Sequence, residues 1–349
     1  MNDLSVMAQI STSDLRMDGP DPSVRSLRAL VAISPAFDPA TEIVVCIPCF
    51  RRPQYLRRTL DSLAAQRTSR RFAVVMVEND VSKSESVPVA AEYLASGKFA
   101  GLCVIEPRQG NCHAINAAFE TALQMFPAAS SLLMIDDDEI ASPDWLEQMV
   151  RTAAATGADI VGGPVFPEFD DERKRWLRHH PAFAPAYDAS GPVPVIYGCG
   201  NCLIRRSVFT RLGMPAFDLR FNFLGGGDTD FFHRCRRLGM RFHWVNEATI
   251  SETVPQGRTS LKWLVMRGLR IGAINYHVQR KATPAPRLRA KLTAKLLAAL
   301  PLSLAYAVRA LLSERKGTIA MHPVAVAIGS ALAAFGLEPQ PCKASKIVS

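Results

Sequence analysis

Apolar and polar positions change in a regular order from about residue 41 onward, and the order predicts strands and helices in alternation. Short continuous apolar runs are typical of buried strands, and apolar residues three or four apart are typical of helices. The predicted strands cover residues 43–47, 72–77, 102–105, 131–135 and 159–161. The predicted helices cover residues 53–66, 87–96 and 112–126, then one that begins at Ser142 as its N-cap, with Pro143 after it, and one over 229–238.

Strands that alternate with helices indicate a parallel sheet covered on both faces. Ligands of such sheets bind at the carboxyl ends of the strands. Polar clusters follow three of the predicted strands, at 48–53, 78–80 and 136–139. The first loop has no G-x-G-x-x-G pattern, which argues against a dinucleotide fold. We expect residues 1–40, with four prolines in the second half, to be a loose leader and residues 41–255 to be the α/β domain.

Four adjacent carboxylates, Asp136 to Glu139, follow an apolar strand. They repel one another unless a cation compensates their charge. Mg²⁺ and Mn²⁺ prefer carboxylate oxygens and bridge to substrate phosphates. Asp136 and Asp138 are two residues apart, so an extended chain points both the same way. The alternative is a solvated acidic loop that caps the next helix.

A second cluster joins three glycines, 225–227, to Asp228 just before a predicted helix. The glycines allow close approach of the backbone to a ligand. A carboxylate on such a loop suits a general base. The alternative is a simple helix N-cap at Asp228 or Thr229.

The composition allows one large domain with an appendage. The chain has 349 residues, of which 48% are hydrophobic and 21% charged, so the whole chain is not disordered. The net charge is +9, but residues 256–316 hold thirteen Lys or Arg against one acid, which leaves residues 1–255 mildly acidic. A nucleic-acid enzyme more often carries its basic patch around the active site, so we expect no nucleic-acid partner.

The basic segment leads into apolar sequence, and we expect residues 256–337 to be helical and membrane-associated, with 338–349 as a tail. Leu292–Leu312 is rich in Leu and Ala, and Thr318–Leu337 has twenty residues without a formal charge, which is long enough to span a bilayer. Basic residues before an apolar segment fit the cytoplasmic face of the inner (plasma) membrane and its anionic lipids. The alternative is a pair of helices packed on the domain.

Eight cysteines include two C-x-x-C pairs, Cys46 with Cys49 and Cys199 with Cys202. Two such pairs are a conceivable zinc site. Cys46, however, ends an apolar run, and scattered cysteines of this kind are usually buried thiols. We therefore expect buried thiols.

Taken together, four motifs resemble the inverting glycosyltransferases of family 2. They are a strand followed by Pro-x-Phe-Arg-Arg-Pro, then Glu-Asn-Asp, then Asp-Asp-Asp-Glu-x-x-x-Pro-Asp-Trp-Leu, then Gly-Gly-Gly-Asp-Thr-Asp-Phe-Phe. Within the family they are most similar to the succinoglycan-type exopolysaccharide glucosyltransferases, and the resemblance runs from about Thr41 to Tyr276. It implies the GT-A fold, an α/β nucleotide-diphospho-sugar transferase fold with a Rossmann-like, mostly parallel sheet.

The resemblance also implies roles for individual residues. The residues implied to bind the nucleotide-sugar are Pro48, Phe50, Arg52, Glu78, Asn79, Asp80, Asn111, Asp136, Asp137 and Arg258. Asp228 falls where the family keeps its catalytic base, and Asp136 with Asp138 form the D-x-D pair that holds Mn²⁺ or Mg²⁺. The residues implied on the acceptor side are Gly200, Asn201, Asp230 and Trp263.

Three positions depart from the family pattern. Gly227 stands where relatives usually have Glu, Ser251 where they often have His, and Ile115 where they often have Arg. The implied reaction moves a sugar from a UDP-sugar, expected to be UDP-glucose, to a growing lipid-linked polysaccharide at a membrane surface. The alternatives are a nucleotidyl- or phosphotransferase that uses the same acidic cluster, a degenerate sugar-nucleotide-binding scaffold and, more distantly, a two-metal nuclease.

Overall fold

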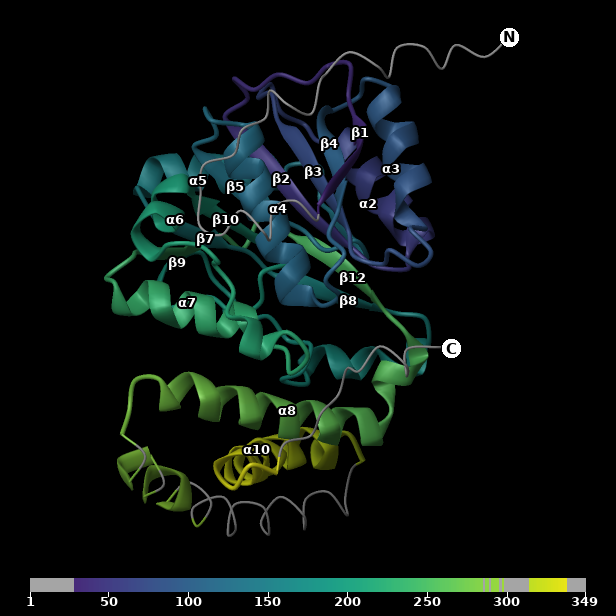
Figure 1. Cartoon of the computed structure of the whole chain (residues 1–349). Coiled ribbons are helices and arrows are strands. Elements are labelled where there is room, and N and C mark those ends of the chain that lie inside the picture. Colours follow the sequence, from purple (N-terminus) through teal and green to yellow (C-terminus); the bar gives the residue numbers. More distant parts are fainter. Residues whose placement is uncertain (1–27, 285, 289, 295–296, 298–313, 338–349) are drawn as a thin grey trace.

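The computed structural model describes residues 28–284, 286–288, 290–294, 297 and 314–337, and all structural statements below concern these residues. They form a large twisted sheet with helices on both faces, together with two long helices, α8 and α10, that lie along one end of it (Figure 1). Helix α8 lies between the α/β part of the molecule and α10.

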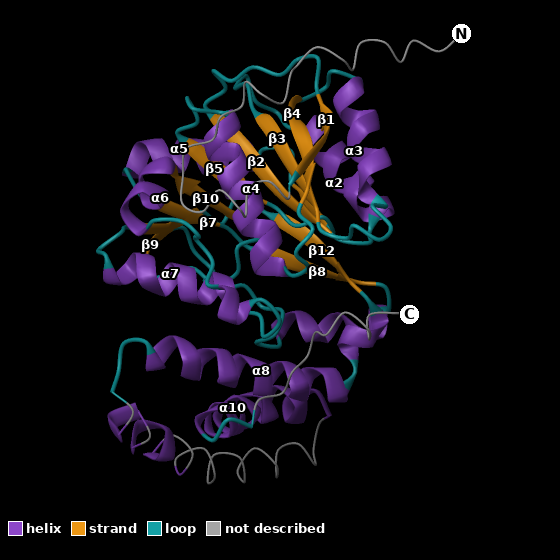
Figure 2. Ribbon diagram, in the orientation of Figure 1, coloured by secondary structure: helices purple, strands orange, loops and turns teal. Residues whose placement is uncertain are grey.

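The main sheet has nine strands in the order β1-β4-β3-β2-β5-β10-β7-β11-β9 (Figure 2). The four inner strands β4, β3, β2 and β5 are parallel, and β10 is antiparallel to β5 and β7. The strands are β1 (Ala29–Ile33), β2 (Ile43–Cys49), β3 (Ala73–Glu78), β4 (Ala100–Ile105), β5 (Ser131–Met134), β7 (Ile160–Gly162), β9 (Gly191–Val193), β10 (Cys202–Arg205) and β11 (Phe242–Trp244).

Helices cover both faces of this sheet because its inner strands are apolar on both sides. In β2, Val44 and Cys46 face one core, while Val45 and Ile47 face the other. Helices α4, α6 and α7 pack on the first face, and α2, α3 and α5 on the second. The helices are α2 (Pro53–Ala64), α3 (Ser86–Ala95), α4 (Asn111–Met125), α5 (Trp145–Thr156), α6 (Arg206–Leu212), α7 (Gly227–Arg237), α8 (Leu261–Arg280) and α10 (Glu314–Ala334), with 3₁₀ turns η1 (Glu172–His179), η2 (Leu219–Phe221) and η3 (Gln256–Thr259).

A second, three-stranded sheet crosses the end of the first. Its order is β6-β12-β8, with β6 (Glu139–Ala141), β8 (Val165–Phe169) and β12 (Ile250–Val254). Strand β12 is antiparallel to β6 and parallel to β8. It places Glu252 directly opposite Glu139, so residues more than a hundred positions apart share one edge.

The predicted strands and helices are all present, with boundaries that differ by a few residues. The expectation of a loose leader over 1–40 was wrong for its last part, because residues 29–33 form the edge strand β1, antiparallel to β4. All five of its residues are apolar, and the strand is partly exposed because it forms the edge of the sheet. Residues 1–27 lie outside the described part. Helix α5 begins at Trp145 rather than at Ser142, whose backbone carbonyl accepts a hydrogen bond from the Trp145 amide.

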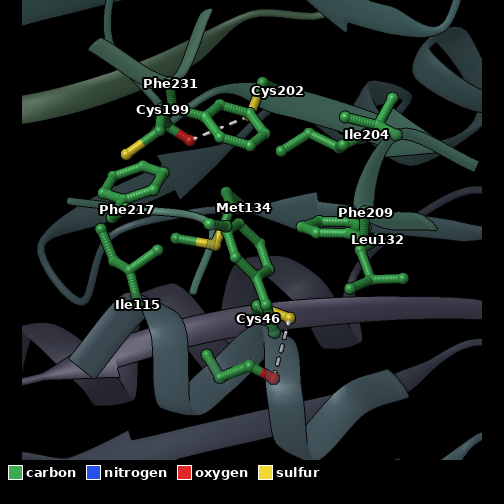
Figure 3. Packing of buried hydrophobic residues seen from close by; sticks show 14 of the residues in the cluster. Cys46, Ile115, Leu132, Met134, Cys199, Cys202, Ile204, Phe209, Phe217 and Phe231 are labelled. Atoms are coloured by element: carbon green, nitrogen blue, oxygen red, sulfur yellow. Dashed lines mark hydrogen bonds between the residues drawn. The ribbon is translucent and has the colours of Figure 1, made fainter. Parts of the chain in front are cut away.

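The seven cysteines in the described residues are free and buried, as expected. Cys46 and Cys202 both pair in register with Met134, from opposite sides of β5. Figure 3 shows Met134 in the packed apolar cluster between Cys46 and the Cys199–Cys202 pair. Burial raises the pKa of each of these three thiols well above its usual value. The two C-x-x-C pairs therefore belong to the packed core as buried thiols.

Helices α8 and α10 pack through small residues. Side chains at Gly272 and Gly329 would overlap backbone atoms of Val326 and Leu269 on the facing helix. The Ser330 hydroxyl donates to the Gly272 carbonyl oxygen at 2.9 Å. Helix α10 therefore packs closely on α8, and its residues 317–334 are also long and apolar enough to cross a membrane. The two alternatives drawn from the sequence, a packed helix and a membrane-length segment, concern this one helix. The earlier apolar segment, 292–312, lies almost entirely outside the described residues.

Replacing Gly272 by Ala should destabilise the protein, because the added methyl group overlaps the Val326 carbonyl oxygen and the helices must separate. We expect a loss of about 1–3 kcal/mol in the free energy of unfolding, measured by urea denaturation. Gly257→Ala is the matched control, since its new methyl group meets no atom. Equal losses in both variants would contradict the close helix contact.

Candidate active site

Three parallel strands end at one edge of the sheet and bring three polar segments together. The register pairs Cys49 with Glu78, and Cys46 with Met134, so the loops after β2, β3 and β5 leave the sheet side by side. Hydrogen bonds join them: the Asn79 amide donates to the Cys49 carbonyl oxygen at 3.0 Å. This is the edge where the sequence predicted a ligand site.

The loop after β2 binds directly to the acidic loop after β5. The backbone amide of Phe50 donates to Asp137 Oδ2 at 2.9 Å. The Arg52 guanidinium contacts both Asp137, at 3.3 Å, and Asp138, at shorter range. Arg51 has φ 54°, a left-handed conformation that is costly for a residue with a side chain. Its Nε pairs with Asp80 at 2.5 Å, which holds the loop in this conformation.

The Glu-Asn-Asp segment after β3 supports the edge. Glu78 is fully buried and accepts hydrogen bonds from the backbone amides of Asp80 and Ser86. Asn79 donates to the carbonyl oxygens of Glu106 and Arg108, so its amide side chain holds the following loop. Asp80 is buried as well, and its carboxylate accepts hydrogen bonds from Arg51 and Ser82; the Arg51 guanidinium holds the pKa of this carboxyl below the usual value.

Carboxylates are crowded where β5 ends. Burial, together with the neighbouring Asp138 and Asp137, raises the pKa of Asp136 to about 8. Burial also raises the pKa of Asp137 to about 7, although Arg52 opposes the rise. The pKa of Glu139 is well above its usual value for the same reasons, and that of Glu252 is raised as well. If all these carboxyls ionised, they would carry a surplus of negative charge over Arg52, which is why they retain protons when no cation is bound.

This surplus fits a divalent cation. Asp136 and Asp138 can supply oxygen ligands, and a hard cation of this kind commonly takes its remaining ligands from water and substrate phosphates. The described residues contain no preformed group of three or more His, Cys, Asp or Glu around a common point. A metal would therefore be held by the D-x-D carboxylates together with the substrate. Ser251, on β12, leaves the family's further histidine contact unfilled.

Asp228 approaches the same edge from the first turn of α7. Gly226, with φ 84°, is the N-cap, so Asp228 is not the cap that the alternative interpretation required. Its Oδ1 accepts a hydrogen bond from the Thr229 amide at 2.7 Å. After burial, Asp228 and Asp136 are the two charges that most raise the pKa of the buried Cys199 thiol, so both act on it electrostatically. That Asp228 and the acidic cluster form one site stays a prediction.

The departures from the family pattern have steric explanations. A side chain at Gly227 would meet Cys112 Sγ and the Phe217 ring at 2.8 Å, so the backbone there lies directly on the core. Ile115 is fully buried in the same apolar cluster, where an Arg would have no partner (Figure 3). Neither position could receive the family's charged residue without repacking the core.

The four residues predicted on the acceptor side fall into two groups: two that do not have buried polar partners, and two that are buried and hydrogen-bonded within the protein. A side chain at Gly200 would overlap the Glu139 carboxylate, so this glycine lies at the acidic edge. Trp263 stacks on Phe183, with centroids 5.6 Å apart. Asn201, in contrast, is buried and binds Trp145 Nε1 at 2.7 Å. Asp230 is also fully buried, and its two oxygens bind Arg234 and Lys281 at 2.8 and 2.5 Å.

The remaining predicted residues differ in exposure. Pro48 is buried within β2, and Asn111 is exposed at the start of α4. Arg258 Nη1 pairs with Glu252 at 2.6 Å. Glu252, which no sequence motif singled out, joins the acidic cluster beside Glu139 through the pairing of β12 with β6. That pairing depends on the second sheet, so local spacing gave no sign of it.

Comparisons with known proteins agree with this architecture. A profile described as Glycosyl transferase family 2 matches residues 44–213, and one described as Glycosyl transferase family group 2 matches residues 131–334. The Succinoglycan biosynthesis protein ExoM of Rhizobium meliloti (strain 1021) is 35% identical over 240 residues, which cover 66% of this chain and 72% of that protein. The O-antigen biosynthesis protein RfbC of Myxococcus xanthus is 27% identical over 216 residues, 57% of this chain and 16% of that protein.

A solved structure with a similar fold is the mannosyltransferase PcManGT from Pyrobaculum calidifontis, determined in complex with GDP-Man and Mn²⁺. It superposes with a TM-score of 0.55 at 19% sequence identity and covers 86% of this chain and 89% of that chain. The likeness bears on the fold alone, and it confirms the GT-A architecture expected from the sequence.

Replacing Asp136 by Asn should change how stability depends on pH. The native Asp136 carboxyl keeps a proton up to about pH 8, whereas the unfolded one loses it near 3.8. The metal-free native state therefore loses stability as pH rises through this window, and Asn removes that contribution. When the pH rises from about 5 to about 8, we expect the free energy of unfolding of the wild type to fall by at least about 1 kcal/mol more than that of the variant.

The measurement is urea denaturation in the presence of a chelator at both pH values. Asp144→Asn is the control, because Asp144 is exposed near the start of α5 and should keep the wild-type dependence. Identical pH dependence in wild type and Asp136→Asn would rule out the buried, protonated carboxyl.

Proposed function

Since this chain belongs to glycosyl transferase family 2, we propose that it is an inverting glycosyltransferase that moves a sugar from a UDP-sugar to a growing, lipid-linked saccharide. The observation that carries the proposal is the crowded group of carboxylates at the end of β5, and Asp228 acts together with Asp136 on the buried Cys199. Family membership sets aside the nuclease and nucleotidyltransferase alternatives. The degenerate binding protein remains as one outcome of the experiment below.

In the proposed reaction, an acceptor hydroxyl attacks the anomeric carbon of the donor sugar. A new carbon–oxygen bond forms on one face of the sugar while the bond to the diphosphate oxygen breaks on the other, so the configuration inverts. The electron pair of the broken bond leaves with UDP. Asp228 takes the proton from the attacking hydroxyl, which a half-exposed carboxylate within reach of solvent can do.

Asp136 and Asp138 are the residues proposed to hold Mn²⁺ or Mg²⁺, and such an ion neutralises charge on the departing diphosphate. Phe50 and Asp80 are proposed to meet the uracil and ribose, because Phe50 is an aromatic residue in the loop after β2 and Asp80 is a carboxylate in the neighbouring loop after β3, with Arg51 contacting both. Glucose is the sugar proposed, by likeness to the succinoglycan-type relatives.

We place the enzyme on the cytoplasmic face of the plasma membrane through the outer side of α10. One side of this helix packs on α8 through His322, Ala325 and Gly329. The outer side adjoins this one: it carries Met321 and Ile328, which are seven residues apart and 47% and 42% exposed, and Phe335, just after the helix, is 82% exposed. Because α8 itself reaches the active site, the pair is proposed to lie in the membrane interface rather than to cross it.

The first experiment measures UDP release from a panel of UDP-sugars, and GDP release from GDP-sugars, in the presence of a membrane lipid extract. We expect release with one UDP-sugar that depends on Mn²⁺ or Mg²⁺. Asp228→Asn should lower the rate by about a hundredfold or more because the proton acceptor is lost. Asp138→Asn should weaken the dependence on metal.

Asp144→Asn is the control and should keep the wild-type rate, since this exposed Asp lies outside the acidic cluster. UDP binding without turnover for any sugar would favour the degenerate binding protein. Release from a GDP-sugar instead would overturn the proposed donor while leaving the transferase in place.

Membrane binding is tested separately by flotation of the protein with lipid vesicles. We expect the wild type to bind vesicles that contain anionic lipid, and Ile328→Asp to weaken binding about tenfold, because a charge replaces an apolar contact in the interface. Leu238→Asp, at an equally exposed apolar residue at the end of α7, is the control. Equal binding by both variants would contradict the assignment of this face to lipid.

A further inference from the structure

One arginine of α8 points at the active site without an ionic partner. Arg267 lies two helical turns before Ile274, on the same side of α8. Ile274 is in direct contact with Gly226, where any side chain would overlap it, and Gly226 immediately precedes the turn that carries Asp228. The side of α8 that bears Arg267 therefore faces the first turn of α7.

The Arg267 guanidinium is poorly satisfied. Its Nε is buried and has no hydrogen-bond partner among the described residues. Across that same part of the chain, no carboxylate lies within ion-pair distance of it, although the neighbouring cations Arg258 and Lys281 are both paired. An arginine has five donors and cannot lose its charge, so burying it unpaired is costly.

The charges around Arg267 locate it between the two halves of the site. Burial lowers the pKa of Arg267, Asp228 and Glu252 oppose this change, and Arg258 reinforces it. Asp228 is the proposed base on α7, whereas Glu252 and Arg258 belong to the wall formed by β12 and η3. Among the described residues, Arg267 is thus a cation without an ionic partner on which charges from both α7 and β12 act.

We infer that Arg267 binds a phosphate oxyanion of the substrate beside Asp228. The inference rests on the proposed function and deepens it by assigning an anion-binding residue to the C-terminal helices. Phosphate matches the planar, multiple donors of an arginine, and two parallel hydrogen bonds would complete the unsatisfied side chain. Arg258 is the less suitable candidate, because its guanidinium already pairs with Glu252.

Two sources can supply this oxyanion: the diphosphate of the nucleotide-sugar donor, or the pyrophosphate of a lipid-linked acceptor. The test separates them with binding and kinetics on Arg267→Gln and Arg267→Lys. To test the donor diphosphate, calorimetry measures the affinity for UDP in the presence of Mn²⁺. Uridine, which has no phosphate, is the control ligand. The KM for the lipid extract at saturating UDP-sugar reports the acceptor arm.

If the donor diphosphate is bound, Arg267→Gln should weaken UDP binding about tenfold or more and leave uridine binding unchanged. If the acceptor pyrophosphate is bound, UDP affinity stays the same and the KM for acceptor rises by a similar factor. Either result supports the inference. Arg267→Lys should recover part of the loss, because it restores charge but not the fork of donors.

Arg237→Gln is the control, an exposed arginine at the end of α7. Unchanged UDP affinity and unchanged KM in folded Arg267→Gln, with an active wild type, would overturn this inference alone. A wild type that neither binds UDP nor turns over would instead overturn the proposed function. Should Arg267→Gln fail to fold, inorganic pyrophosphate must still raise the melting temperature of the wild type more than that of Arg267→Lys, and equal shifts would overturn the inference.

Discussion

The repulsion among carboxylates at the carboxyl end of β5 is the constraint on which the rest of the site depends. Asp136, Asp137 and Asp138 are held at the end of a strand that is apolar on both faces, so they cannot move apart into solvent. The loop after β2 offsets part of this charge, because the Phe50 amide and the Arg52 guanidinium donate hydrogen bonds to the carboxylates. The remaining negative charge is what a divalent cation would balance, and the same cation would also neutralise part of the charge of a substrate diphosphate.

The second constraint is that the C-terminal helices are part of the site rather than an appendage. Lys281, at the end of α8, joins the buried Asp230 of α7 to Asp218, and the same helix carries Ile274 against Gly226. Helix α10 is held in turn by backbone-to-backbone contact at Gly272 and Gly329. Helix α8 therefore supports both the first turn of α7, which carries Asp228, and helix α10 with its apolar outer side.

Much of the fold and of the site could be predicted from the sequence, for a physical reason. The central strands are continuous apolar runs, and parallel strands place their carboxyl ends together, so local pattern was sufficient to locate Phe50, Asp80 and Asp136 at one edge. The pairing of β6 with β12 and the unpaired state of Arg267 depend on contacts between distant segments, which spacing along the chain does not encode. For Asn201 and Asp230 the sequence motif was misleading. It suggested that they bind a ligand, but both are buried and form hydrogen bonds within the protein, with Trp145 and Lys281.

The ion pair between Asp230 and Lys281 also has a consequence for biosynthesis. A nascent chain translated only as far as α7 has Arg234, among the described residues, as the ionic partner of Asp230. The second partner, Lys281, is translated 51 residues later. The strands β6, β8 and β9 likewise wait for β11 and β12, so the chain completes both its sheets and this ion-pair network only after α7 has been made.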